Sequence, residues 1–177
     1  MVALNPLSDR PNADGFTLIE LIIVVAIIAI ITALAVAGLL RSRAAANEAS
    51  AIASIRVTSS SQKAYAISCG FGAYATGYVV LGAAIGANDA YISADLAAAS
   101  PTKAGYSFNL VAGLGSGAGP TDCAGRPTMT AFYATAVPLS VWSGARSFAI
   151  NGNGALWQIN SASAPTEPFG PPARPLQ

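Results

Sequence analysis

The fold of this chain is decided by residues 15–40, which read GFTLIELIIVVAIIAIITALAVAGLL. From Leu21 to Leu40 every residue is apolar except Thr32 and Gly38, and none is charged. A helix of about 20 residues rises about 30 Å, which matches the hydrocarbon thickness of a bilayer. No proline interrupts the run, and the Ile, Val, Leu and Ala that fill it are compatible with a helix throughout. We therefore predict a membrane-spanning helix.

A cleaved secretory signal is the ordinary alternative for such a segment. Its apolar region is usually about 7 to 15 residues long, follows a basic segment and precedes a cleavage site of small residues. The run in this chain is longer, and the residues before it include Asp9, Arg10 and Asp14, two acidic residues against one basic. A secretory signal removed after the apolar run therefore fits poorly.

One carboxylate, Glu20, stands at the head of the apolar run. A charged carboxylate in hydrocarbon costs about 2 to 3 kcal/mol on insertion scales unless it gains a partner. A cut after Gly15 would create an α-amino group on Phe16, with a pKa of about 8, about one helical turn from Glu20. The same amine of a neighbouring copy is equally available if the helices stagger by a turn. The sequence thus predicts pairing between copies of this chain.

Gly15, Phe16, a glutamate at the fifth position after that junction and a long uncharged span occur here in one order. This order resembles the signature of type IV prepilins and of the related type II secretion pseudopilins; the alternative is a generic membrane anchor with a chance glutamate. The resemblance implies that a dedicated membrane peptidase cuts between Gly15 and Phe16 and N-methylates Phe16. It also implies that Glu20 meets the Phe16 amine of an adjacent subunit during assembly, and that residues 1–15 are a leader that is removed.

Two features differ from the usual pattern of that family. The leader holds one basic residue, Arg10, whereas Arg41 and Arg43 follow the span, so a count of basic residues alone would place the C-terminal part in the cytoplasm. Many pilins also carry proline late in the span, where this chain has Gly38 instead. Any kink there has to come from the glycine.

The helix is predicted to continue well beyond the span. No proline or glycine occurs from Leu39 to Cys69, so one helix over 16–69 is permitted, with 16–40 as its membrane-spanning and filament-core part. One face of its second part is expected to pack on the rest of the chain; it holds Ala44, Ala51, Ile55, Thr58, Gln62, Tyr65 and Cys69. A second stripe is expected to be solvated; it holds Arg41, Glu48, Arg56 and Lys63.

Residues 70–164 are predicted to form a globular part with a small antiparallel sheet. The two Asn-Gly pairs at 151–154 lie between apolar runs and are typical of a hairpin. The segment 91–99 favours a short helix, and residues 165–177 hold five prolines and are expected to be an extended or loose end. The strand-like runs are Tyr106–Val111, Thr128–Val137, Arg146–Ile150 and Ala155–Ile159. The expected fold is α+β, with a long N-terminal helix packed on the sheet as in type IV pilins.

Cys69 and Cys123 are the only cysteines. An even number in a chain with an export-type N-terminus favours a disulfide over a metal site, because two thiolates alone hold a metal poorly. Two reduced buried thiols are the alternative. A disulfide would tie the helix end to the sheet and would require the globular part to lie outside the cytoplasm.

The composition gives no indication of catalysis. Hydrophobic residues make up 53% of the 177 and charged residues 10%, and the absence of histidine excludes a His-assisted triad and a His-bound metal. The glycine-rich run 113–119 matches no phosphate-binding spacing, so we expect a flexible surface loop. Trp142 and Trp157 are expected to be sheet and core residues. We expect no enzyme, no cofactor and no metal; the acidic positions, too sparse for the calcium cluster of major pseudopilins, include Asp89, Asp95 and Asp122.

The resemblance and the residues together predict a structural subunit of a type IV pilus. It would wait in the inner membrane as a single-pass precursor with its C-terminal part in the periplasm. The inner-membrane assembly machinery would then add it to an extracellular homo-oligomeric filament. The alternatives are a type II secretion pseudopilin and a minor pilin for DNA uptake or adhesion. We expect no nucleic-acid partner, because the net charge is +1 and the basic residues of the globular part are few and scattered, namely Lys103, Arg126, Arg146 and Arg174.

Overall fold

The computed structural model describes residues 15–84 and 90–176. Its dominant element is the helix α1 (Leu18–Ser68), which confirms the predicted long N-terminal helix. The chain divides between Leu39 and Leu40 into two compact units, and α1 crosses this division. The second unit contains the end of α1 and all the strands.

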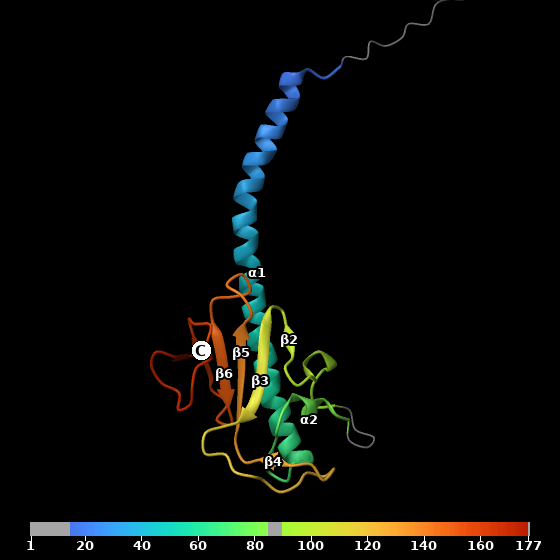
Figure 1. The fold of residues 1–177 in the computed structure, drawn as a ribbon, viewed down its shortest axis with the longest axis vertical. Helices are drawn as coiled ribbons and strands as arrows, with labels where there is room; N and C mark the ends of the chain where they lie inside the picture. The colour runs from blue at the N-terminus through green and yellow to red at the C-terminus, as the bar shows by residue number, and fades with distance from the viewer. Residues whose placement is uncertain (1–14, 85–89, 177) are drawn as a thin grey trace, which may run out of the picture. The chain divides into compact units, whose positions relative to one another are not determined.

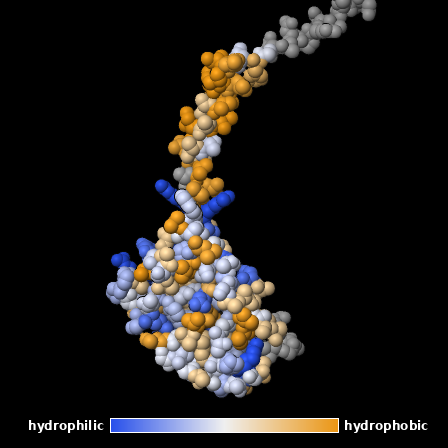
Figure 2. Space-filling model, viewed as in Figure 1, coloured by the Kyte–Doolittle hydropathy of each residue, from blue (hydrophilic) through white to orange (hydrophobic). Residues whose placement is uncertain are grey.

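The part of α1 before this division has apolar side chains that the rest of the chain does not bury. Every described side chain from Phe16 to Leu40 is exposed. Figure 2 shows this hydrophobic surface along the N-terminal part of α1, in contrast to the mixed surface of the sheet-bearing unit. The hydroxyl of Thr32 donates to the carbonyl of Ile28 at 2.7 Å, so the helix itself satisfies this polar group.

A six-stranded antiparallel sheet, in the order β2-β3-β5-β6-β7-β8, forms the second unit with the end of α1 (Figure 1). β1 and β4 form a separate antiparallel pair. The α+β layout is consistent with the type IV pilin fold. The elements after α1 are β1 (Tyr74–Ala75), α2 (Tyr78–Gly82), the 3-10 helix η1 (Ala94–Leu96), β2 (Thr102–Lys103), β3 (Tyr106–Ala112), β4 (Thr128–Met129), β5 (Phe132–Pro138), β6 (Ser147–Asn151), β7 (Leu156–Ile159) and β8 (Arg174–Pro175).

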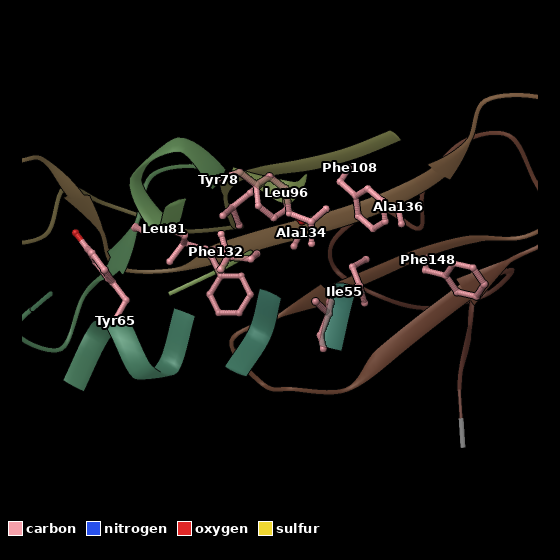
Figure 3. Packing of buried hydrophobic residues seen from close by; sticks show 14 of the residues in the cluster. Ile55, Tyr65, Tyr78, Leu81, Leu96, Phe108, Phe132, Ala134, Ala136 and Phe148 are labelled. Carbon is pink, nitrogen blue, oxygen red and sulfur yellow. The ribbon is translucent and has the colours of Figure 1, made fainter. Parts of the chain in front are cut away.

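The predicted packing face of α1 lies in the core. Ala44 is half-buried, and the other six residues of that face are buried. Figure 3 shows Ile55 of α1 between Phe132 and Phe148 of the sheet, and Tyr65 of α1 belongs to the same buried core. The one amide on this face, Gln62, is satisfied by the backbone of Ala75, to which it donates and from which it accepts at 2.8 Å. The hydrogen bonds that the Gln62 amide loses to water on burial are therefore replaced by bonds within the protein.

The hairpin predicted at 151–154 is confirmed between β6 and β7. The amide of Gly154 donates to the carbonyl of Asn151 at 3.0 Å, and the amide of Asn153 donates to the Asn151 side chain. Gly154 has a φ of +81°, a conformation that favours glycine. The turn residues thus fix the register of the two strands.

Three local expectations differ from the structure. The run 128–137 is two strands, β4 and β5, and the short helix expected over 91–99 is only η1. The loop 113–119 is tied down, because Gly117 and Thr130 exchange hydrogen bonds and an isolated bridge joins Ala118 to Met129.

The end over 165–177 was expected to be extended or loose, and its described residues 165–176 include an extended strand that docks on the sheet. β8 pairs with β7, and the ring of Phe169 stacks on Trp157 at 5.3 Å between centroids. The hydroxyl of Tyr133 donates to the carbonyl of Pro165. Proline is compatible with such an edge strand, because the outer side of an edge strand needs no amide donors.

Candidate processing and assembly site

Gly15 and Phe16 lie immediately before α1 and are exposed, Phe16 to 89%. A Cβ placed on Gly15 would meet no atom within 4 Å, so the space around this residue does not require glycine. The bond between the two residues is therefore open to an external enzyme. Residues 1–14, the rest of the predicted leader, lie outside the described residues.

Thr17 and Glu20 join across the start of α1 by three hydrogen bonds that run in both directions. The amide and hydroxyl of Thr17 donate to Oε2 of Glu20 at 2.9 and 2.7 Å, and the Glu20 amide donates to the Thr17 hydroxyl at 3.3 Å. This is a capping box, which satisfies backbone amides that the first helical turn leaves without partners. The spacing Thr-x-x-Glu in the sequence is the signal for this cap, a role of Glu20 beyond the predicted one in assembly.

The apolar part of α1 follows this cap directly. Among the described residues, α1 is the one helix that is long and apolar enough to cross a membrane. Exposed aliphatic side chains surround it on all sides, in contrast to a helix that buries one stripe on its own domain. This part of α1 can be stable in hydrocarbon or among other apolar helices, because either environment removes its surface from water.

The end of α1 is fastened by the disulfide between Cys69 and Cys123, which confirms the predicted pairing. The Cys123 amide also donates to the Cys69 carbonyl at 2.9 Å. Gly70 lies in a tight place, since a Cβ there would stand 2.1 Å from the carbonyl oxygen of Ala73. The chain can therefore turn away from the helix at this point only with glycine.

A buried carboxylate supports the same corner. Asp122 accepts hydrogen bonds at 2.7 Å from the Tyr65 hydroxyl and from Nε of Arg126, and two backbone amides bind its other oxygen. Burial raises the pKa of Asp122, but these hydrogen bonds outweigh it and lower the pKa to about 2. Asp122 is thus a structural anion at neutral pH.

Glu48 corrects the expectation of a solvated stripe on α1. Its Oε2 lies 2.6 Å from Nη2 of Arg146, and its Oε1 accepts from the amides of Ala145 and Arg146 at 2.9 and 3.2 Å. Arg146 also donates to the side chain of Gln158 at 2.7 Å. Burial raises the pKa of Glu48, but the hydrogen bonds and charge of Arg146 outweigh it and the net pKa is lowered. The other three residues of the stripe are exposed.

Trp142 is not a core residue as expected, because it is 68% exposed in the connection between β5 and β6. Trp157 lies in β7 and is half-buried. Within 15–84 and 90–176, no three His, Cys, Asp or Glu side chains gather where they could hold a metal ion. Asp89 lies outside the described residues, and Asp95 pairs with Lys103 at 2.7 Å.

Residues 10–36 match the family model described as the prokaryotic N-terminal methylation motif. The chain carries the type IV prepilin and pseudopilin signature. No curated protein and no solved structure matches the chain. The match covers the junction, the cap and most of the apolar run, and the strands lie beyond it.

This prepilin signature implies processing by a prepilin peptidase and handling by a pilus-type assembly machinery. With the apolar helix, it fits a precursor anchored in the inner membrane. Cleavage between Gly15 and Phe16, methylation of Phe16 and pairing of Glu20 with a neighbouring amine stay predictions. In the single chain, Glu20 is occupied by Thr17, so an incoming amine would have to share or replace that cap.

Proposed function

We propose that this chain is a structural, non-enzymatic subunit of a type IV pilus. The main support for this proposal is the difference between the two parts of α1. The first part, most of which lies within the prepilin signature, exposes its apolar side chains. The second part contributes to the core of a folded unit. Such a molecule can exchange lipid for copies of itself without unfolding its sheet. Burial of apolar surface among the copies contributes about 25 cal/mol per Å².

In this proposal the inner-membrane precursor is cut after Gly15 and then moves into an extracellular filament. The junction is exposed, and a larger residue would fit in place of Gly15. Both observations support the view that glycine is present at this position for recognition by a peptidase, because the fold does not require it. The new amine of Phe16 would lie near the Glu20 carboxylate of an adjacent copy. A charge pair in an apolar filament core favours one register of the helices over others, because any other register leaves Glu20 without a cation.

A type II secretion pseudopilin is the second candidate. In the described part of the sheet unit, each acidic side chain binds a protein side chain and is not free to hold a calcium ion. Glu48 binds Arg146, Asp122 binds Arg126, Asp95 binds Lys103 and Glu167 binds Asn151. This engagement disfavours a calcium loop of the kind found in major pseudopilins. The same pairs occupy three of the four basic residues considered for DNA binding, which disfavours a DNA-uptake subunit.

Mass spectrometry of the protein from the membrane and from sheared surface material tests this function. We expect a chain that begins at methylated Phe16 in both fractions, with this chain as the main component of the surface filaments. An intact N-terminus or a cut near residue 40 would overturn the processing step. Processed protein that stays in the envelope and is needed for secretion would instead indicate a pseudopilin.

The role of Glu20 is tested with two substitutions that separate charge from capping. Glu20→Gln keeps an oxygen that can accept from Thr17 but removes the charge, and Glu20→Ala removes both. We expect both variants to insert and to be cut, and both to lose filaments by about tenfold or more, which corresponds to about 1.4 kcal/mol per tenfold. Normal filaments from Glu20→Gln would show that the cap, and not the charge, is what assembly requires.

A further inference from the structure

The connection between β5 and β6 presents apolar side chains to solvent. Leu139, Val141 and Trp142 are 59%, 82% and 68% exposed. Val141 and Trp142 are the two central residues of a turn, which we name the Trp142 turn and define as Ser140–Ser143. Turn centres usually hold glycine, asparagine, aspartate or proline, so two large apolar residues there are not explained by the turn itself.

The backbone of the Trp142 turn is held in place by hydrogen bonds and close packing. The Ser143 amide donates to the Ser140 carbonyl at 3.0 Å, and the hydroxyls of the same two serines lie 3.0 Å apart. At one flank the Leu139 amide donates to the Gly105 carbonyl at 2.9 Å. At the other flank Gly144 fits closely, because a Cβ there would lie 2.1 Å from the Tyr106 hydroxyl. The exposed side chains therefore have a fixed base.

That base is attached to α1 shortly after the apolar run ends. Glu48 binds the amides of Ala145 and Arg146 and the Arg146 guanidinium. Within the second unit, Figure 1 shows the connection, in orange, at the end of the sheet where this unit's part of α1 begins. From Leu40 to Glu48 the helix rises about 12 Å. Two extended residues, the separation between Ala145 and the end of the turn at Ser143, reach up to about 7 Å back along this rise. The turn can therefore reach the headgroup layer, which is about 5 to 7 Å thick on each side of a bilayer.

We propose that the Trp142 turn lies in the headgroup layer of the periplasmic leaflet while the precursor is anchored in the membrane. Tryptophan is enriched at this level of membranes because its ring is apolar and its N–H is polar. The exposed Arg41 and Arg43 lie on the helix between the span and Glu48, where lipid phosphates can bind them. The turn is then a second contact that limits rotation of the sheet unit about the helix. This inference rests on the membrane-anchored state of the proposed function.

Tryptophan fluorescence of the full chain in vesicles tests the inference. The vesicles contain phosphatidylethanolamine and phosphatidylglycerol, with or without lipids brominated near the headgroup end of the acyl chain. Trp142→Phe is the matched control, because it leaves Trp157 as the only tryptophan. We expect the wild type to emit at shorter wavelength in vesicles than in detergent-free buffer and to be quenched by bromine. The signal lost in Trp142→Phe should account for most of that quenching.

Flotation of the same vesicles separates the two proposals. Protein that floats but whose Trp142 signal stays unquenched and at the wavelength of water-exposed tryptophan overturns the inference and leaves the pilus proposal intact. Protein that does not float overturns both. Shielding of Trp142 that arises only in assembled filaments also overturns the inference and assigns the turn to a contact with a neighbouring copy.

Discussion

The two parts of α1 share one secondary structure but differ in what covers them. Before the division at Leu39, every described side chain from Phe16 onward is exposed, whereas the second part buries a stripe that includes Ile55 and Tyr65. Helix-breaking proline does not distinguish them, because neither part contains any; the first part is rich in isoleucine and alanine and the second in alanine. The second part owes its stability to its own chain. The first part requires an apolar environment that its own chain does not provide, such as lipid or other apolar helices.

Loss of the disulfide should cause the largest decrease in the stability of the second part and should leave the first part unaffected. Cys69 and Cys123 are 54 residues apart, and a loop of this length contributes about 4 kcal/mol in the chain-entropy model. We expect the double variant Cys69→Ser/Cys123→Ser to lower the free energy of unfolding of the sheet unit by that amount. Urea unfolding of the full chain in micelles measures it. Unchanged unfolding would mean that the buried core alone holds this corner.

A pair of isoleucines tests the comparison directly. Ile55 is fully buried and Ile28 is 57% exposed. Ile55→Ala should lower the free energy of unfolding of the sheet unit by about 3 kcal/mol, because it leaves a cavity in the core. Ile28→Ala, measured in the same micelles, should leave that free energy unchanged and should reduce only assembly. Equal effects of the two substitutions would contradict the division.

Acid should affect the second part selectively through Asp122. Its pKa is lowered to about 2 in the folded chain, against about 4 for an unfolded aspartate. The unfolded chain therefore binds the proton first, so this contribution to stability is complete above about pH 4 and is lost as the pH falls toward 2. We expect a smaller effect than that of Ile55→Ala. Unfolding curves of Asp122→Asn should show a weaker dependence on pH over that range; an identical dependence would assign it to other groups.

The cap of the first part should give the smallest effect. Thr17→Ala removes one side of the capping box and should destabilise the first helical turn by about 1 kcal/mol. Faster amide hydrogen exchange at Glu20 and Leu21 in micelles would show it. Thr32→Ala is the control, because the Thr32 hydroxyl bonds only a carbonyl inside the helix. Equal exchange in the two variants would contradict the role of Thr17.

Prediction from the sequence succeeded where a pattern is local or periodic. The uncharged run, the spacing of the packing face and the hairpin at Asn151–Gly154 are each set by neighbouring residues. It failed at Glu48, whose spacing with exposed basic residues suggested solvent, because its partner Arg146 is 98 residues away. The capping box at Thr17 could have been read from its spacing and was missed.

The tail and the tryptophans show the same limit. Proline content predicted an extended or loose end, but it did not predict that the strand β7 offers an edge on which Arg174–Pro175 pairs. Hydrophobicity predicted burial of Trp142, but the turn from Ser140 to Ser143 turns its side chain outward. Neither outcome follows from composition, since both depend on which surfaces the finished sheet leaves open.

The apolar run, the junction at Gly15–Phe16, the long helix and the two available cysteines could all be predicted before folding, because they follow from residue type and from spacing along one chain. The pairing of carboxylates with cations, the docking of the C-terminal residues on the sheet and the exposure of Trp142 in its turn depend instead on the tertiary structure. Those features require segments far apart in sequence to meet, and only the folded sheet brings them within contact distance.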